Sequence, residues 1–405
     1  MTDKILVILF FFGSHITFNI VGSLSLSELL SLFYLLFLNS KGLLRHREVL
    51  SFTHLFILLE TTKVLSEFFV SNGISSTLKG LAIPLFSVLN TLFLTRLLLR
   101  DKDNMGACLL TYVVSALFFG NQLAEGVTIT DITTGDGATA LKFFYAKIIT
   151  MTILLFSLWR YKEAIAVYGI TGFIFLVLGA RSAGVIAELS AFAAYIAMKK
   201  RFIYSTKSIV ISALVLMSAS YPVYVFYVNS VLNGEITAGN SEQLRKAQNP
   251  YNPIELLKQG RSDAWVAWQA FCDKPLLGHG AWAYDYSGKY LKMQLDIAGE
   301  KFEKEKFKKN TNWLVPSHSV LINQGSQNGI LAFTCMLLIT IYVSKLHIEA
   351  MRAAPRKFTL ILSSGLFSLW WDILFSPPSH LRMTLPFLFA TALALHIKYY
   401  PRPSA

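Results

Sequence analysis

The chain has 405 residues, of which 54% are hydrophobic, 14% are aromatic and only 15% are charged, and its mean hydropathy is +0.49. A soluble chain of this length cannot hide so much apolar surface in one core, so the composition excludes a soluble globular protein and indicates a polytopic membrane protein. The net charge of +13 then reflects basic residues that flank membrane segments, and nucleic-acid binding is the poorer explanation.

Apolar runs of about 17 to 25 residues recur along the chain, and each is long enough to cross a hydrocarbon layer as a helix. We expect about twelve such helices, because lipid offers backbone groups no other hydrogen-bond partner. The fold class predicted is therefore an all-α polytopic membrane protein. The predicted spans are Ile5–Val21, Leu24–Leu38, Leu50–Val70, Leu78–Leu99, Met105–Asn121, Leu141–Trp159, Ala164–Gly179, Ser182–Met198, Ser208–Val228, His318–Ser344, Phe358–Phe375 and Met383–His396.

Lys and Arg gather in alternate short connections, for example at Arg45 and Arg47 and at Arg160 and Lys162. The positive-inside rule then places both termini in the cytoplasm and the long hydrophilic segment 229–317 on the opposite side. We expect three regions: transmembrane helices one to nine in 1–228, a loop domain in 229–317, and helices ten to twelve with a short cytoplasmic tail in 318–405.

The large loop contains three predicted helices and one tight turn. The stretches "NPYNPIELLKQG" and "RSDAWVAWQAFCDKP" each predict a helix, and the second places Arg261, Trp265 and Trp268 on one face. In "LLGHGAWAY" two glycines flank His279, which predicts a tight turn. The stretch "GEKFEKEKFKKN" predicts a charged, solvated helix.

Two arginines stand at the extracytoplasmic side of this topology. Arg181 lies between two apolar spans, where a guanidinium costs at least a few kcal/mol unless it meets an anion. Together with Arg261 it could hold a diphosphate through two-pronged hydrogen bonds. The structural alternative for Arg181 is an ion pair with Glu188, two turns further along the same helix face.

His318 stands where the large loop meets an apolar span, in "PSHSVLINQGSQNGILAF". An imidazole with an unperturbed pKa of about 6.5 can accept a proton at working pH, although a helix-capping or interfacial histidine is the structural alternative. His279 and His380 face the same compartment. No carboxylates stand at ligand spacing beside these histidines, so we predict no metal and no other cofactor.

Other charged residues have simpler interpretations. Asp101 and Asp103 fall in a short cytoplasmic connection and are read as juxtamembrane charge. Glu60, Lys63 and Glu67 share a helix face within the third span, where they can neutralise one another; a proton path is the functional alternative. Motifs for nucleotide binding, serine hydrolases and dithiol chemistry are absent from the sequence.

Three stretches together resemble a known family. "LGARSAGVIAELSAFAAYIAMKKR", "RSDAWVAWQAFCDKPLLGHGAWAY" and "PSHSVLINQGSQNGILAF" occur in the order and spacing of the bacterial O-antigen ligase and polymerase superfamily. The resemblance covers roughly 179–338. The family often has Asn after the histidine, whereas this chain has Ser319, so a side-chain amide cannot orient the imidazole here.

The resemblance implies a GT-C-like membrane enzyme that transfers a lipid-linked glycan with inversion and without a metal. It implies that His318 is the catalytic base and that Arg181 and Arg261 bind the diphosphate of an undecaprenyl-diphosphate donor. His279 and Trp265, which lie in the same loop, are our further candidates for support of this site. The acceptor would be lipid A–core, and the site would face the periplasm from the bacterial inner membrane.

Two other functions stay open at this point. An O-antigen or exopolysaccharide polymerase would use a second lipid-linked repeat unit as acceptor, but polymerases tend to have two sizeable periplasmic loops and this chain has one. A membrane transporter would explain the charged third span, but not the arginines and histidine around a single loop.

Overall fold

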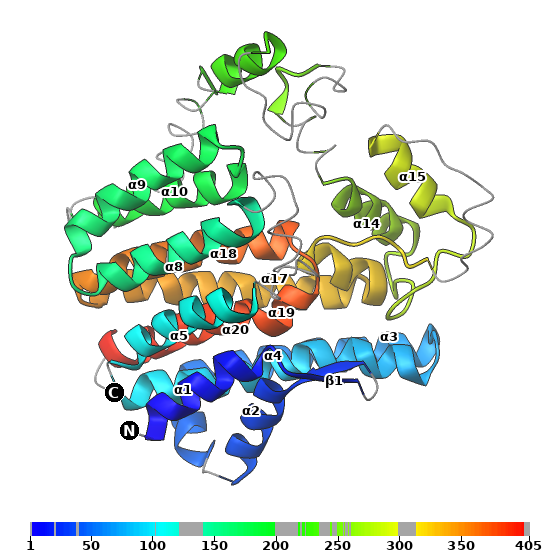
Figure 1. Cartoon of the computed structure of the whole chain (residues 1–405). Coiled ribbons are helices and arrows are strands. Elements are labelled where there is room, and N and C mark those ends of the chain that lie inside the picture. Colours follow the sequence, from blue (N-terminus) through cyan, green and yellow to red (C-terminus); the bar gives the residue numbers. More distant parts are fainter. Residues whose placement is uncertain are drawn as a thin grey trace.

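The structure, a computed structural model, describes residues 2–19, 22–37, 40–101, 103–120, 141–198, 224–234, 249–253, 261–298 and 313–400, with isolated positions between 218 and 258. Most of these residues are helical (Figure 1). The ninth predicted span lies mostly outside the described residues. So do the charged helix predicted at 299–310 and most of the helix predicted after Asn252.

The α-helices are α1 (Thr2–Gly13), α2 (Leu26–Phe37), α3 (Arg47–Phe69), α4 (Ile74–Arg100), α5 (Asn104–Phe119), α8 (Ala146–Ser157), α9 (Tyr161–Val177), α10 (Arg181–Met198), α14 (Ser262–Asp273), α15 (Lys289–Ala298), α17 (Val320–Ala353), α18 (Thr359–Phe375), α19 (Ser379–Met383) and α20 (Leu385–Tyr399). Short helical turns occur at η1 (Ser40–Arg45), η2 (Leu141–Tyr145) and η3 (Arg356–Phe358), and two strands, β1 (Thr17–Asn19) and β2 (Ser23–Ser25), form a ribbon.

Four helical segments of the described chain are long and apolar enough to cross a membrane: α3, α4, α17, and the segment Arg356–Phe375 made by η3 and α18. Shorter apolar helices, among them α5, α8 and α20, pack beside them. These segments support a helical membrane protein. They do not establish the twelve spans expected from hydropathy.

The N-terminal region departs from the prediction. The first expected span, Ile5–Val21, is helical only to Gly13, and Thr17–Asn19 then form strand β1 of an antiparallel ribbon with β2, in which Thr17 pairs with Ser25. Helices α1 and α2 have 12 residues each, and such a helix is only about 18 Å long, against a hydrocarbon core of about 30 Å. The prediction was wrong here because hydropathy records how apolar a stretch is, and not whether its backbone is helix or strand.

A buried ion pair holds this ribbon against α19. Ser25 and Glu28 form half of a capping box, since the Ser25 N–H donates to Glu28 Oε2 at 2.7 Å. The same fully buried carboxylate pairs with the guanidinium of Arg382 on α19, and Arg382 also donates to the Ser23 carbonyl. The ribbon is therefore attached to the end of the bundle at which α18 passes into α19.

Helices α17 and α18 lie at the centre of the bundle, with α4 and α20 on one side and α9 and α10 on the other (Figure 1). Tyr168 of α9 lies 3.1 Å from Ser364 of α18, and Ser157 at the end of α8 donates to the Lys357 carbonyl beside the start of α18. Helices α9 and α18 therefore run in the same direction. The junction of α9 with α10 lies at the same end as the last turn of α18, and we call this end the loop end.

Helix α17 is bent at Gly329, where φ is 77° and ψ is −171°. The bend frees the carbonyls of Ser326 and Gln327 from the helix ladder, and they accept the N–H groups of His279 and Gly280 at 2.8 Å each. In return the Ile330 N–H donates to the Pro275 carbonyl at 2.8 Å. The segment after α14 thus replaces the missing helical hydrogen bonds, and this fixes the loop on the bundle.

Candidate functional site

The last turn of α18 contacts residues from several other elements at the loop end. The guanidinium carbon of Arg261 lies 5.6 Å from the ring centre of Trp371. The next residue, Asp372, pairs with His380 of α19 at 3.3 Å, and Ser319 Oγ donates to the carbonyl of Ile373 at 3.1 Å. One helical turn therefore contacts the start of α14, the start of α17 and α19.

His318 and Asp263 face each other across this region. Nδ1 of His318 lies 2.9 Å from Oδ2 of Asp263, and the two side chains are 34% and 24% exposed. Asp263 stands in the first turn of α14, and its other oxygen accepts a hydrogen bond from Gln294 of α15. A carboxylate held in this way can fix the tautomer and the orientation of the imidazole.

Ser319, directly after His318, is the N-cap of α17: its hydroxyl accepts the Ile322 N–H at 3.1 Å and also donates to the Ile373 carbonyl. Ser319, and not His318, therefore caps α17, so the helix-capping alternative for His318 is wrong. The orientation of the imidazole, which the missing amide at position 319 left unexplained, comes from the carboxylate of Asp263.

Arg261 immediately precedes α14 and is its N-cap residue, with φ −139° and ψ 40°. The expectation that it shares a helix face with Trp265 and Trp268 is therefore wrong, because its backbone is not helical. Burial lowers the pKa of Arg261, while the carboxylates of Asp263 and Asp372 oppose this shift. No hydrogen bond or ion pair joins its guanidinium to another described residue, so the charge is available to an anion.

Arg181 is the first residue of α10, also at the loop end. Its Nη2 donates to the Tyr227 hydroxyl at 2.8 Å, and the guanidinium carbon lies 4.9 Å from the centre of that ring. Its Nε is buried without a hydrogen-bond partner among the described residues. The ion pair with Glu188, the structural alternative for Arg181, is not formed, since the Glu188 side chain packs against Gly172 of α9.

Asp372 is the centre of a second charged group that sequence reasoning missed. Besides His380, its carboxylate accepts the Ser376 hydroxyl at 2.8 Å and interacts electrostatically with Lys147 of α8. The signal was present in "WWDILFSPPSH", because an aspartate inside an apolar span is a functional candidate by default. Asp372 also interacts with Arg261, so this group borders the surroundings of His318.

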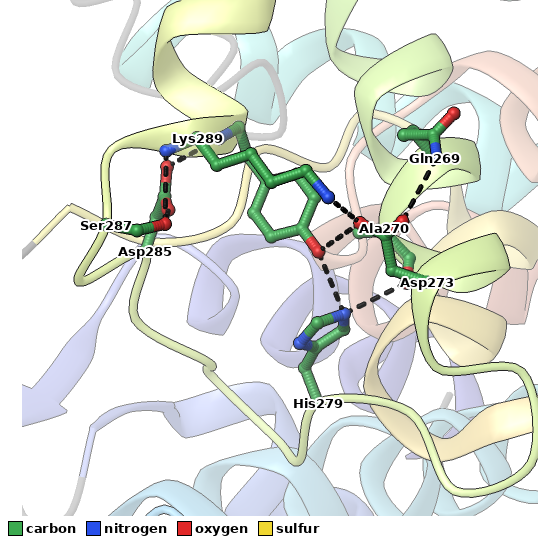
Figure 2. Close-up of polar contacts among 8 residues, drawn as sticks. Gln269, Ala270, Asp273, His279, Asp285, Ser287 and Lys289 are labelled. Carbon is green, nitrogen blue, oxygen red and sulfur yellow. Dashed lines mark hydrogen bonds and ion pairs between the residues drawn. The ribbon is translucent and has the colours of Figure 1, made fainter.

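His279 belongs to a separate network (Figure 2). Its Nε2 donates to the Ala270 carbonyl at 2.9 Å and lies 3.2 Å from the Tyr290 hydroxyl, which donates to Asp273 at 2.7 Å. Lys289 also donates to Asp273, and this bond lowers the pKa of that carboxyl to about 2. Burial lowers the pKa of His279.

These contacts of His279 lie at the C-terminal end of α14, whereas Asp263 and His318 meet at its first turn. His279 therefore holds α14 to α15, and its backbone holds the loop to α17. It supports the site through the fold. The glycines on either side have φ of 71° and 83°, as the predicted tight turn requires.

Trp265 is 41% exposed, and the ammonium of Lys258 lies 5.9 Å from its ring centre. Its contacts give it no role at His318.

The charged residues of α3 do not neutralise one another through close ion pairs in the described part of the chain. Lys63 donates to the Gly80 carbonyl of α4, whereas Glu67 accepts the Thr77 hydroxyl at 2.6 Å and the Ala281 N–H at 2.5 Å. Glu67 therefore connects α3 to the loop.

Among the described residues no group of three or more His, Cys, Asp and Glu side chains is arranged to hold a metal ion. Comparison with known proteins assigns no family to the chain, because no family model and no curated protein matches it.

Proposed function

We propose that the chain is a membrane glycosyltransferase of the O-antigen ligase type, which moves a glycan from undecaprenyl diphosphate to lipid A–core in lipopolysaccharide biosynthesis. The single observation that carries this proposal is the pairing of His318 with Asp263 at 2.9 Å beside the half-buried cation of Arg261. A base and a cation at the loop end of a helical bundle suit a reaction between a lipid diphosphate and a hydroxyl.

The proposed reaction is a single displacement. The oxygen of an acceptor hydroxyl bonds to the anomeric carbon, and the bond from that carbon to the diphosphate oxygen breaks with its electron pair. Asp263 accepts from Nδ1–H of His318, so Nε2 is the nitrogen that takes the hydroxyl proton. Attack from the face opposite the leaving group inverts the configuration.

The leaving diphosphate gains negative charge as the bond breaks. Arg261, stacked near Trp371, and Arg181, whose buried Nε has no partner among the described residues, would stabilise that charge. Trp371 and Tyr227 hold the two guanidinium planes, which reduces the entropy lost when the anion binds. This scheme needs no metal, so transfer should continue in excess chelator.

The proposed location is the bacterial inner membrane, with both termini in the cytoplasm and the loop end on the periplasmic side. The basic residues in alternate connections support this orientation, since cytoplasmic connections are enriched in Lys and Arg. Reporters fused near Gly239 and near Lys200 test it. The first should report the periplasm and the second the cytoplasm, and the same side for both would remove the proposed site.

A deletion strain tests the function through its lipopolysaccharide gel ladder. A ligase predicts loss of all O-antigen bands together with accumulation of lipid-linked polymer. A band of core plus one repeat unit would indicate a polymerase instead. An unchanged profile would exclude both functions.

A further inference from the structure

A short extended segment after the His279 turn presents aromatic side chains in a row. The Asp285 N–H donates to the Trp313 carbonyl at 2.8 Å and the Val315 N–H donates to the Ala283 carbonyl at 2.9 Å, so Tyr284 pairs with Leu314 in an antiparallel bridge. Only residues 283–285 around the bridge are extended, because 281–282 and 286–287 form turns, so the burial of each side chain shows whether it meets solvent. Ala281, Ala283 and Asp285 are all buried, with at most 6% exposed.

The residues between them are Trp282, Tyr284 and Tyr286, which we call the aromatic row. Tyr286 is 77% exposed, and its ring centre lies 5.7 Å from that of Tyr284. Trp282 and Tyr284 are partly exposed. Trp313 of the partner segment is 37% exposed, but it stands opposite Asp285 and therefore on the other side of the bridge from Tyr284. The alternation thus leaves aromatic faces in contact with solvent on a backbone that the bridge holds in place.

The backbone of Trp282 is strained in a way that fixes the row. Its φ is 53°, and it is the one non-glycine residue with a positive φ in the described part of the chain. The residue before it is held on both sides, by α3 and by the turn that follows α3, since the Ala281 N–H donates to Glu67 and the Ala281 carbonyl accepts from Asn72. Such strain costs about 1–3 kcal/mol, persists only where the surroundings impose it, and is common at ligand sites.

We propose that the aromatic row binds a glycan chain by stacking against the apolar faces of its sugar rings. A pyranose presents one face of C–H groups that packs on an aromatic ring, while its hydroxyls need hydrogen-bond partners at the edge. Tyr284 and Tyr286 supply hydroxyls, and the ammonium of Lys79 lies 5.7 Å from the ring centre of Trp282. Aromatic side chains with one apolar face and one polar group suit such a ligand.

The composition of this surface favours a sugar over lipid. Within the described segments 281–293 and 313–315, the aliphatic side chains of Leu291, Met293, Leu314 and Val315 are only partly exposed, and the more exposed residues are Tyr286, Ser287, Lys289, Lys292 and Trp313. By contrast, the junction of α3 and α4 exposes Phe68 and Ile74 at 82% and 81%, with no hydroxyl on either side chain. A surface buried in lipid resembles that junction, whereas the aromatic row combines rings with hydroxyls and a cation.

The row is also continuous with the candidate site. Leu314, its bridge partner, precedes His318 by four residues, and four extended residues span at most about 14 Å. A chain of a few sugar rings covers that distance. That the bound glycan is the one transferred in the reaction rests on the proposed function. That a glycan binds to the aromatic row does not.

The test uses the full chain in lipid nanodiscs. The probe is oligosaccharide freed of lipid by mild acid from the lipid-linked glycans of the producing cells, and its binding is followed by saturation-transfer NMR. The double variant Tyr284→Ala and Tyr286→Ala should bind about fivefold more weakly or worse, since each ring contributes to stacking. The control is Trp159→Ala, another exposed aromatic residue at the opposite end of the bundle, which should bind like the parent.

No binding by the parent, or equal binding by parent and double variant, would overturn the proposal. Quenching of Trp282 fluorescence by brominated phospholipid, measured as the signal lost in Trp282→Phe, would assign the row to the membrane interface instead. Suppose that glycan binding depends on the aromatic row but the protein shows no transfer activity. That result would refute the proposed function and would still support this inference. Transfer activity in a protein whose glycan binding does not depend on the aromatic row would support the proposed function and refute this inference.

Discussion

The imidazole of His318 and the carboxylate of Asp263 meet at 2.9 Å, although one belongs to the segment before α17 and the other to the first turn of α14. Both elements reach the last turn of α18, through Ser319 and Arg261 respectively. The pair is therefore held by the fold from two sides, as a base and the group that orients it should be.

Asp263→Asn tests the orienting role. The amide keeps the size of the side chain but removes the negative charge and can present an N–H to His318, which favours the wrong tautomer. We expect transfer to fall about tenfold or more while donor binding is retained. The measurement is the turnover rate alongside donor affinity. A variant with full turnover would show that the contact only joins α14 to α17.

Arg261→Lys and Arg181→Lys test the diphosphate contacts. A lysine keeps the charge but loses the planar fork that matches phosphate oxygens and stacks on Trp371 or Tyr227. Each variant should accumulate normally and lose about tenfold or more in donor affinity. Arg160→Lys, an exposed arginine at the opposite end paired with Glu163 at 3.7 Å, is the control and should change nothing. Unaltered affinity in both test variants would make the two arginines structural.

Gly329→Ala tests the bend in α17. A Cβ at this position would stand 2.0 Å from the Leu276 carbonyl oxygen, and φ is +77°. We expect the free energy of unfolding to fall by about 3 kcal/mol or more, because backbone on both sides must shift. Thermal unfolding in detergent measures it.

The matched variant is Gly179→Ala. Gly179 has a φ of +87° but nothing within 4 Å of an added Cβ, so only the conformational cost of about 1–2 kcal/mol applies. Equal losses in the two alanine variants would mean that the contact with the loop contributes nothing.

Asp273→Asn tests the network that holds α14 to α15. The pKa of this carboxyl is about 2, below the value of about 3.9 in an unfolded chain, so the unfolded chain binds the proton first as pH falls. The stabilisation is complete above the unfolded value and disappears as pH falls through about 2. The side chain is partly exposed and screened, so we expect a loss below about 1 kcal/mol at neutral pH.

The difference in Tm between the parent and Asp273→Asn should therefore shrink between about pH 4 and pH 2. Lys289→Met should lower Tm in a similar way and add little when combined with Asp273→Asn, since both remove the same contact. A difference that does not depend on pH would contradict this view of the network.

Much of the helical plan follows from the sequence because apolar length determines it. The predicted Leu50–Val70 and Ser182–Met198 became α3 (Arg47–Phe69) and α10 (Arg181–Met198), with small shifts at the ends. The ribbon of β1 and β2 was missed because the stretch "HITFNIVGSLS" contains enough apolar residues to continue a predicted membrane helix. Its hydrogen bonds are made between strands and leave no helical periodicity.

The site was only partly predictable. His318, Arg181 and Arg261 could be selected because charged or titratable groups beside apolar spans are costly without a function. The partner of His318 could not be predicted, because the contact between α14 and α17 depends on tertiary packing. In the sequence, Asp263 looks like an ordinary acidic residue at the start of a helix. His279 was proposed as support, and the structure gives it a role in the fold through Ala270, Tyr290 and the bend in α17.

Binding of the lipid-linked donor and glycan transfer, both measured on purified His318→Ala beside the parent, test the catalytic proposal. Alanine removes the proton acceptor and leaves both arginines, so donor binding should survive while transfer falls about a hundredfold or more. Intact transfer would contradict a catalytic role for His318. Lost binding with residual turnover would make His318 a ligand of the diphosphate instead of the base.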